Sequence, residues 1–472
     1  MKVLLTGATG YIARNLLPSL LASGHEVYCC VRDKNRFDIS RYKSPNLKVI
    51  EVNFLKKESL RIIPDDIDAA YYLIHSMSVS TGDFEVLEKE SAENFTERLS
   101  ETSVKQVIYL SGIVNNEVLS KHLSSRKAVE EILSSGSFLL TTLRAGIILG
   151  SGSASFEIIR DLVEKLPVMI TPRWLNTRCQ PIAIQNVIQY LHGALENEST
   201  FGKSFDIGGT EILTYKEMLL GFAKVRKLRR YIFVVPVMTP RLSSYWLYFI
   251  TSTSYSLAVN LVHSMKIEVV CGENNLQKVI PLKLLSYEEA IKAAFEKIER
   301  QEVVSSWTDA LSSRTLEAGI SQLVTVPTFG CFSDKRVLKL DDENRTLERI
   351  WSIGGQTGWY YGNWLWRIRG FMDKLAGGVG LRRGRRSETE ISPGDALDFW
   401  RVLIASKEEK RLLLYAEMKL PGDAWLEFRI ADGALYQTAT FRPLGLWGRL
   451  YWYSVLPLHG LIFKGMIRRI AI

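Results

Sequence analysis

One short segment near the N-terminus limits the possible folds more than any other: TGATGYIA at residues 6–13. It follows an apolar, strand-like run at residues 2–6 and opens a helical pattern, which is the context that gives such glycine spacing its meaning. Gly7 permits a tight turn, Gly10 lets the backbone approach a pyrophosphate, and Ala13 lets helix and strand pack closely. The helix N-terminus then faces the phosphates. We therefore expect a dinucleotide to contact Gly7, Thr9, Gly10, Tyr11 and Ile12.

Strand-like and helical segments alternate through the first 210 residues. This βαβ rhythm predicts an α/β fold with a parallel, doubly wound sheet of the Rossmann type. The expected helices are residues 14–23, 84–102 and 127–134, with a further one at 287–300. The expected strands are residues 2–6, 26–31, 47–52, 69–74, 106–111, 139–144 and 204–207.

The chain has 472 residues, more than one hydrophobic core usually organises, so we expect two domains. After about residue 320 the pattern changes to alternating strands, and eight of the eleven tryptophans lie there. Residues 410–420, 424–431 and 433–442 are expected to form antiparallel strands, and residues 457–471 a closing helix with proline in its first turn. We place the domains at 1–305 and 320–472, joined by the polar segment 301–319.

Composition excludes several classes of protein. The net charge of +9 is modest, so nucleic acid is not expected as a partner. The five cysteines and six histidines show no disulfide or metal-binding spacing, and no signal peptide is evident, which predicts a cytoplasmic protein without a metal. Residues 243–265 lack Lys, Arg, Asp and Glu, but ten of them are Ser, Thr, Asn or His. We expect a buried amphipathic helix there rather than a transmembrane span.

The spacing T-G-x-x-G-x-x-[GA] resembles that of the short-chain dehydrogenase superfamily, particularly the extended and atypical members related to NmrA-like proteins and to nucleotide-sugar epimerases. Further marks are VRD at 31–33, YLSG at 109–112 and RAGIILG at 144–150. The resemblance covers residues 1 to about 300 and implies a nicotinamide cofactor.

Four further positions are expected at the cofactor. Arg32 stands where an NAD enzyme usually places an acidic residue, and its guanidinium could clamp a 2′-phosphate, which favours NADP. NAD stays open if Arg32 is instead solvated and paired with Asp33. Asn53 can donate and accept hydrogen bonds near the adenine. His75 ends the fourth strand, where carboxyl ends face the cofactor, and Ala145 lies in the RAGIILG turn.

The superfamily's chemistry uses a serine after one strand and a Tyr-x-x-x-Lys pair on the next helix. Ser111 takes the serine position, but His122 stands for the tyrosine and Arg126 for the lysine. Histidine can act as a general acid or base near neutrality, and Arg126 could hold the ribose. His122 could equally be a polar cap or surface residue. These residues favour an NAD(P)-dependent oxidoreductase acting on an unidentified, hydrophobic small molecule; the alternative is a catalytically inactive NAD(P)-binding regulator or assembly factor.

Residues 354–361, 363–367, 377–386, 398–401 and 417–422 resemble an uncharacterised bacterial domain fused behind atypical short-chain dehydrogenases. The resemblance implies an α+β, helix-grip, lipid-transfer-like fold with an apolar cavity. Its best pocket candidates are Trp359, Tyr360, Trp364 and Trp366, although most aromatics are expected to fill the core. Arg382, Arg383, Arg385 and Arg386 could meet an anion, and the closing helix allows peripheral membrane contact or lipid carriage.

Overall fold

The computed structural model describes residues 1–34, 37, 39, 42–74, 84–114, 121–235, 259, 262, 264–299, 326, 331–376, 378–380, 385 and 390–472. The described residues up to 299 belong to one compact unit and those from 326 onward to another. The expected connection at 301–319 lies outside the described residues, as does most of the segment 243–265. No helix among the described residues is long and apolar enough to cross a membrane.

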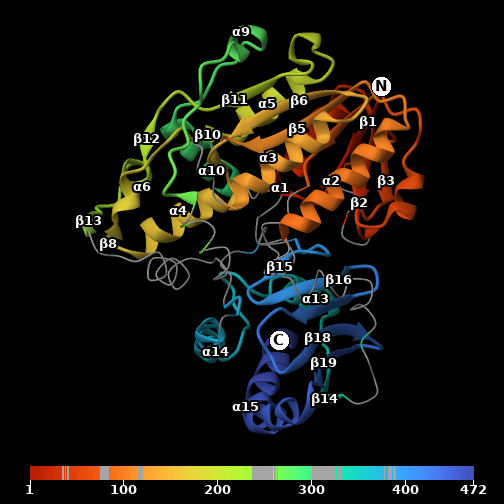
Figure 1. Ribbon diagram of the computed structural model, residues 1–472. Coiled ribbons are helices and arrows are strands. Elements are labelled where there is room, and N and C mark those ends of the chain that lie inside the picture. Colours follow the sequence, from red (N-terminus) through yellow and green to blue (C-terminus); the bar gives the residue numbers. More distant parts are fainter. Residues whose placement is uncertain are drawn as a thin grey trace. The chain divides into compact units, whose positions relative to one another are not determined.

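A seven-stranded parallel sheet forms the centre of the first unit (Figure 1). Its strands, in spatial order, are β11 (Ser204–Ile207), β6 (Leu139–Ala145), β5 (Gln106–Gly112), β4 (Ala69–Tyr72), β1 (Lys2–Leu5), β2 (Glu26–Val31) and β3 (Leu47–Glu51). All neighbours are parallel. These are the seven strands expected from the sequence, which confirms the doubly wound sheet. The chain order reverses between β1 and β4, the position where such sheets bind ligands.

Helices cover both faces of this sheet, as a parallel sheet requires. On one face α1 (Tyr11–Ala22) packs beside α5 (Ile184–Ala194), with Leu16, Leu20 and Leu191 in a shared core. On the other face α2 (Phe84–Ser100) packs beside α3 (Lys121–Ser134). There the ring of Phe95 meets that of Tyr72 edge-on, with centroids 4.8 Å apart. The sheet is therefore buried and only its edges are open to ligands.

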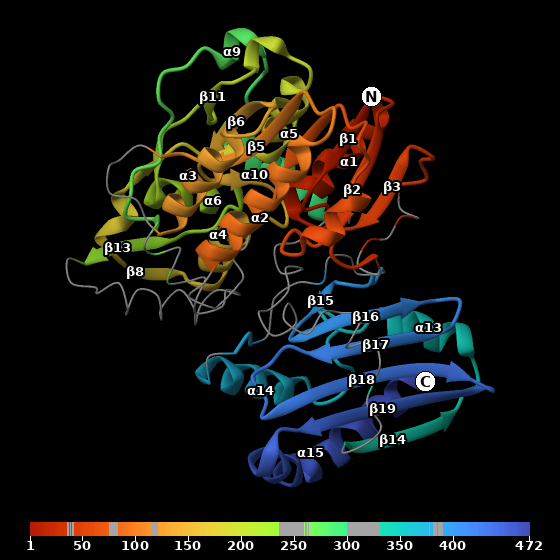
Figure 2. The same ribbon diagram turned by 45° about the vertical axis from the view of Figure 1, so that its right-hand side comes forward.

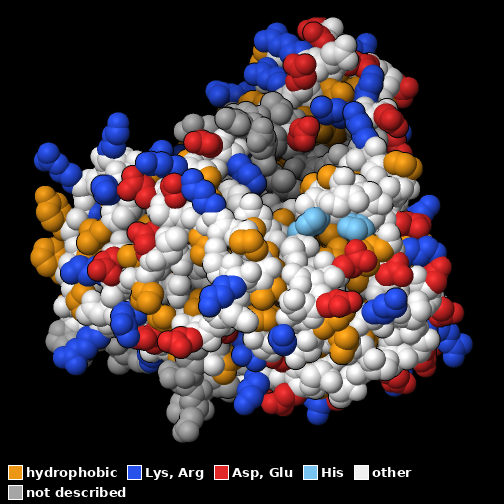
Figure 3. Space-filling view, turned by 90° about the horizontal axis from the view of Figure 1, so that it is seen from above, with side chains coloured by type: hydrophobic (Ala, Val, Ile, Leu, Met, Phe, Trp, Pro, Cys, Tyr) orange, Lys and Arg blue, Asp and Glu red, His pale blue; other side chains and the backbone are white. Residues whose placement is uncertain are grey.

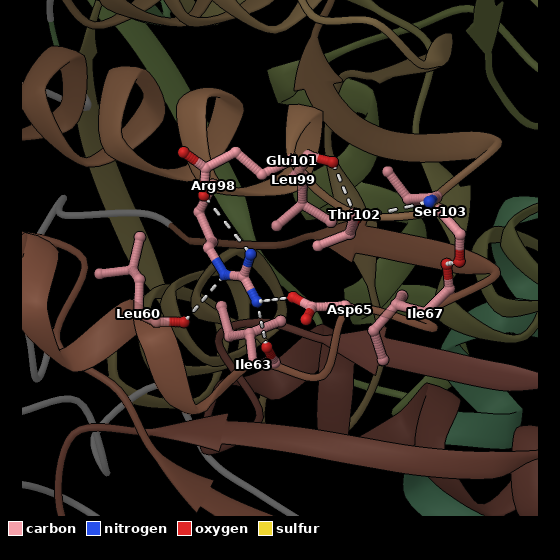
Figure 4. A network of polar contacts seen from close by, with 10 residues as sticks. Leu60, Ile63, Asp65, Ile67, Arg98, Leu99, Glu101, Thr102 and Ser103 are labelled. Carbon is pink, nitrogen blue, oxygen red and sulfur yellow. Dashed lines mark hydrogen bonds and ion pairs between the residues drawn. The ribbon is translucent and has the colours of Figure 1, made fainter.

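Arg98 of α2 fixes the segment that follows β3 (Figure 4). Its Nε donates to the carbonyl of Leu60 in the 3-10 helix η3 (Lys57–Ile62), and its Nη2 donates to the carbonyl of Ile63. The same nitrogen pairs with the Asp65 carboxylate. One guanidinium thus anchors the chain between β3 and β4 to a helix, and so steadies the loop that contains Asn53.

The rest of the first unit is a smaller helical layer. Helices α4 (Ala154–Lys165), α6 (Tyr215–Val225) and α10 (Tyr287–Glu299) meet around Phe156, Phe222 and Phe295, whose ring centroids lie 5.4–5.7 Å apart. Beside this layer lie the short helix α9 (Leu276–Val279) and several two-stranded sheets. In these, β7 (Ile148–Leu149) pairs with β10 (Ile182–Ala183), β9 (Arg178–Cys179) with β12 (Leu213–Thr214), and β8 (Val168–Pro172) with β13 (Tyr231–Val235).

The second unit is an antiparallel sheet with helices (Figure 2). Its strands, in spatial order, are β14 (Phe332–Lys339), β19 (Ala434–Pro443), β18 (Gly422–Ala431), β17 (Arg411–Ala416), β16 (Trp400–Ser406) and β15 (Ala396–Leu397). The helices are α13 (Glu343–Trp351), α14 (Asn363–Leu375) and α15 (Gly445–Ala471), and α15 contacts β19 and β14. The three strands expected from the sequence are β17, β18 and β19.

The start of the closing helix was predicted wrongly. Helix α15 begins at Gly445, and Pro457 lies inside it rather than in its first turn. An interior proline removes a hydrogen bond and usually breaks a helix, which is why the pattern placed the boundary there. Trp452 before the proline and Phe463 after it are both buried in the unit's aromatic core. Packing on both sides of Pro457 therefore holds the helix continuous.

Candidate functional site

The turn between β1 and α1 requires glycine at position 7. Gly7 has φ +61°, and a Cβ there would lie 2.6 Å from the carbonyl oxygen of Leu73, just after β4. The Gly10 N–H closes the turn by donating to the Gly7 carbonyl at 2.7 Å. The fully buried Thr6 hydroxyl donates to the Tyr71 carbonyl and accepts from the Leu73 N–H, both at 3.0 Å. The turn is thus held against the carboxyl end of β4.

Helix α1 presents an open N-terminus to this turn. No side chain caps it at Gly10, and its first turn holds no acidic residue. Arg14 lies in that turn, is buried, and has no hydrogen-bond or ion-pair partner for its side chain among the described residues. Because Cα–Cβ bonds in a helix tilt toward its N-terminus, the Arg14 side chain leaves the backbone on the side of the glycine turn. Free N–H groups, the helix dipole and this cation all favour a bound anion.

Arg14 was not among the site residues expected from the sequence. Its positive charge in the first helical turn could have indicated it, because acidic residues normally complement the dipole there and a cation is unfavourable. An arginine there, directly after the glycine motif, points to an anionic ligand that outweighs this preference. The other expected residues of the turn, Thr9 and Ile12, are half-buried, and Gly10 is exposed.

Arg32 is a second unpaired cation at this edge of the sheet. It directly follows β2, its side chain is exposed, and it has no hydrogen-bond or ion-pair partner in the described part of the chain. The alternative pairing with Asp33 is therefore not formed. Asn53 follows β3, and its Oδ1 accepts from the N–H of Leu55 at 3.1 Å. The side-chain NH₂ has no hydrogen-bond partner among the described residues, and Oδ1 has a second lone pair, so Asn53 can still donate and accept toward a ligand.

Ser111 and Arg126 meet at the carboxyl end of β5. From α3, Arg126 donates through Nη1 to the carbonyl of Leu110, the residue before Ser111, at 3.1 Å. Ser111 is 2% exposed, and its hydroxyl has no hydrogen-bond partner among the described residues. The buried Nε of Arg126 also has none. The structure therefore brings together two of the three expected catalytic residues, each with hydrogen-bonding capacity to spare.

Tyr109 lies on the same strand but does not replace the missing catalytic tyrosine. Its hydroxyl donates to the Arg126 carbonyl at 3.4 Å. Burial raises the pKa of the Tyr109 phenol, although the neighbouring Arg126 charge opposes the shift. The group therefore stays protonated and engaged with the backbone. His122 precedes Arg126 by one helical turn in α3, with its side chain outside the described residues, and His75 lies outside them entirely.

The loop after β6 closes the site beside Tyr11. Ala145 ends β6 and is buried, and a Cβ at Gly150 would lie 2.5 Å from the Tyr11 hydroxyl. Burial, and then the Glu157 carboxylate, raise the pKa of the Tyr11 phenol well above its ordinary value. Glu157 itself accepts from the Gly152 N–H at 3.2 Å. Tyr11 thus packs the glycine turn against the loop expected to carry part of the site.

The aromatic residues expected to form a pocket in the second unit have different roles. Trp359 is buried and donates its Nε1–H to Asp398 at 2.6 Å, and Tyr360 donates to the Arg349 carbonyl at 3.1 Å. Trp364 is exposed. Of the four candidates, only Trp366 lines the cavity described below.

The arginine cluster is described only at Arg385. It donates to the carbonyls of Trp351 and Ile353, and so holds the end of α13. Arg382, Arg383 and Arg386 lie outside the described residues. In the described part of the chain, no group of His, Cys, Asp or Glu has the arrangement of a metal site.

Two family models match the chain. One is described as NAD(P)H-binding and matches residues 7–152; the other is described as a protein of unknown function, DUF2867, and matches residues 331–466. The first unit therefore contains an NAD(P)-binding, Rossmann-like domain, and the second contains the region that matches DUF2867. No curated protein matches the sequence.

Solved structures with the same fold include two epimerases. A nucleoside-diphosphate-sugar epimerase from Staphylococcus aureus is 15% identical, with a TM-score of 0.50, and the match covers 62% of this chain and 100% of that one. An epimerase from the methanogen Methanothermobacter thermautotrophicus is 11% identical, with a TM-score of 0.50, covering 64% of this chain and 94% of that one. At these identities the likeness shows the fold of the first unit.

Proposed function

We propose that the protein is an NADP-dependent oxidoreductase of the atypical, NmrA-like kind, which acts on a small hydrophobic molecule in the cytoplasm. The observation that carries the proposal is the pair of cations without acidic partners, Arg14 and Arg32, beside the open N-terminus of α1. A 2′-phosphate is a dianion that a guanidinium binds with two parallel hydrogen bonds. An NAD site would instead place an acidic residue at the position that Arg32 occupies.

The residues at the end of β5 supply the chemistry in this proposal. A bound nicotinamide supplies or accepts a hydride. The Ser111 hydroxyl, which is buried at the end of β5, donates a hydrogen bond to the substrate oxygen and orients it. Arg126, held by the Leu110 carbonyl, binds the ribose and keeps a fixed positive charge beside the site. His122 exchanges the proton that accompanies hydride transfer, since an imidazole titrates near neutrality. Ala145, at the end of β6, is assigned to the cofactor in the same proposal, and His75 is assigned to it from its place in the sequence alone.

The second unit is part of the proposal as a helix-grip domain, with the boundary between the domains at residues 305–320. The support is the long helix α15 lying against one side of an antiparallel sheet, around an aromatic core. The same architecture encloses apolar ligands between sheet and helix, in agreement with a hydrophobic substrate.

We also propose peripheral contact with an anionic membrane through α14 and α15. Trp364, Ile368, Phe371, Met372 and Leu375 follow one another at helical spacing along α14 and are each 48–63% exposed. The only acidic residue in the two helices, Asp373, is buried, whereas Arg367, Arg449, Lys464, Arg468 and Arg469 are exposed. Apolar side chains flanked only by cations suit a negatively charged lipid surface.

The catalytic proposal is tested by turnover. Purified protein is incubated with NADPH and a panel of apolar aldehydes, ketones and enones, and NADPH consumption is followed. We expect Ser111→Ala and His122→Ala to lower kcat by roughly 10²- to 10⁴-fold without weakening NADPH binding. Ser124→Ala, an exposed serine on the same helix, is the control and should leave kcat unchanged. Tight NADPH binding without turnover of any substrate would contradict the oxidoreductase and favour a regulator.

A further inference from the structure

A cavity in the second unit is lined by residues of the helices α14 and α15 and of the strands β16, β18 and β19. The cavity is small. The volume that the centres of water-sized molecules can occupy is about 20 Å³, which leaves room for on the order of one or two waters. Aromatic rings dominate its wall. Its lining comprises Trp366, Arg369, Trp400, Leu420, Ala424, Trp425, Ala439, Thr440, Phe441, Tyr451, Trp452, His459 and Phe463.

Three of these lining residues carry a buried ring nitrogen that has no hydrogen-bond partner among the described residues. They are Nε1 of Trp366, Nε1 of Trp400 and Nδ1 of His459. Leaving such a group unpaired in a protein interior costs about 1–3 kcal/mol. An indole N–H can only donate. Three unpaired nitrogens around one cavity are more than a purely structural core would be expected to contain. The two indole N–H groups would be satisfied by a hydrogen-bond acceptor in the cavity.

Arg369 adds a positive charge to the same wall. Its Nη2 donates to the Tyr451 hydroxyl at 2.6 Å and its Nε to the Met418 sulfur at 3.3 Å. Neither partner is charged, and no carboxylate of the described residues pairs with Arg369. The Asp373 carboxylate, on the same helix, accepts from the backbone N–H groups of Gly380 and Lys419 at 2.8 and 2.7 Å. The guanidinium therefore lacks a counter-ion.

We propose that this cavity binds a short-chain carboxylate of the size of acetate. Arg369 supplies the counter-charge, and the indole N–H groups of Trp366 and Trp400 supply further donors. The surrounding rings cover the methyl group of the ligand. A neutral occupant would leave the guanidinium without a counter-ion, and a phosphate dianion would be left with oxygens facing aromatic carbon. The inference rests on the second unit alone and is independent of the proposed oxidoreductase activity.

The ring of His459 agrees with an anion at this place. Burial, followed by the charge of Arg369, lowers the pKa of His459 to about 4, so the imidazole is neutral at pH 7. A carboxylate beside Arg369 would cancel part of that repulsion and raise the His459 pKa again. Binding of the acid should therefore take up a fraction of a proton in weakly acidic buffer.

Tryptophan fluorescence of the full-length protein tests the proposal, because four tryptophans line the cavity. The probe is sodium acetate, and its neutral analogue acetamide and inorganic phosphate are the comparison ligands. We expect saturable quenching by acetate, with acetamide and phosphate at least about tenfold weaker. Arg369→Gln should weaken acetate binding at least about tenfold. Arg345→Gln, at an exposed position of α13, should not change it.

A second variant guards against misfolding of the first. Trp400→Phe keeps an aromatic ring and removes the N–H donor, so it should fold and bind acetate several-fold more weakly. Equal affinity for acetate and acetamide, equal affinity for phosphate, or unchanged acetate binding in both Arg369→Gln and Trp400→Phe would each overturn the carboxylate site.

Discussion

At the scale of single residues, the candidate site depends on one glycine that a larger residue cannot replace without strain and on three polar side chains. Gly7 combines a left-handed backbone with a close approach to the Leu73 carbonyl. Arg14, Arg32 and Ser111 have no protein partners in the described part of the chain, which leaves their charge or hydroxyl for a ligand. A group left unpartnered at the carboxyl edge of a parallel sheet is a better indication of function than its residue type alone.

Gly7→Ala should lower the free energy of unfolding by roughly 2–5 kcal/mol. Left-handed backbone strain accounts for about 1–2 kcal/mol of this, and displacement of the β4 end for the rest. Gly24→Ala is the matched control, because Gly24 has φ +79° and open space around its Cβ position. It should show the strain alone. Urea unfolding measures both, and equal losses would show that the contact with Leu73 is unimportant.

Sequence reasoning could propose Arg32 and Ser111 because each lies at a fixed offset from a strand end, and Arg126 because it stands where the Tyr-x-x-x-Lys pair has its lysine. It could not see that the Asn53 oxygen is used within its own turn, or that Tyr11 packs against Gly150 from far along the chain. Such contacts depend on which segments the fold brings together, and no spacing in a single sequence records them.

At the scale of helices and strands, hydrophobic pattern predicted the elements whose burial is regular. All seven strands of the parallel sheet were found because each is a short apolar run between turns. The pattern failed where packing overrides local preference, as at Pro457 inside α15. It also could not tell which tryptophans face a cavity: Trp364 and Trp366 are two residues apart on α14, yet one is exposed and the other buried.

Helix α14 should mediate the proposed membrane contact. Replacing Trp364 and Phe371 together by serine removes two large exposed rings from its apolar stripe. We expect co-sedimentation with vesicles of phosphatidylglycerol to fall at least about tenfold, since burying each ring contributes about 1.5–3 kcal/mol. Val337→Ser, an exposed apolar position on β14, is the control and should not change it. Equal binding to neutral phosphatidylcholine vesicles would contradict the role given to the cations.

His459 makes the stability of the second unit depend on pH. Its pKa is about 4 in the folded protein, below the ordinary value near 6.5, because the ring is buried. The unfolded chain therefore takes up the proton first as pH falls. The neutral His459 ring therefore stabilises the folded protein fully above about pH 6.5. As the pH falls toward 4 this stabilisation is lost, and the free energy of unfolding decreases by up to about 3 kcal/mol. Urea unfolding followed by tryptophan fluorescence should show this loss, and His459→Phe should flatten it; an unchanged slope would disprove the assignment.

At the scale of the whole molecule, net charge says little about function. The chain carries a charge of +9, and on the face shown in Figure 3 cationic, anionic and hydrophobic side chains are intermixed. Many arginines are neutralised locally, as Arg144 is by Glu130 and the fully buried Arg401 by Glu417. The arginines assigned to ligands, Arg14, Arg32, Arg126 and Arg369, differ by having no carboxylate partner among the described residues. Local pairing, and not the sum of charges, therefore locates the sites.

Calorimetric titration of the full-length protein with NADPH and NADH tests the central claim most directly. We predict that NADPH binds more tightly, that Arg32→Ala weakens NADPH about 10- to 100-fold and NADH hardly at all, and that Arg14→Gln weakens both. Lys48→Ala removes an exposed cation from β3 and should change neither affinity. Equal affinity for the two cofactors, unaffected by Arg32→Ala, would contradict the NADP assignment, and binding of neither would contradict the account of the first unit as a whole.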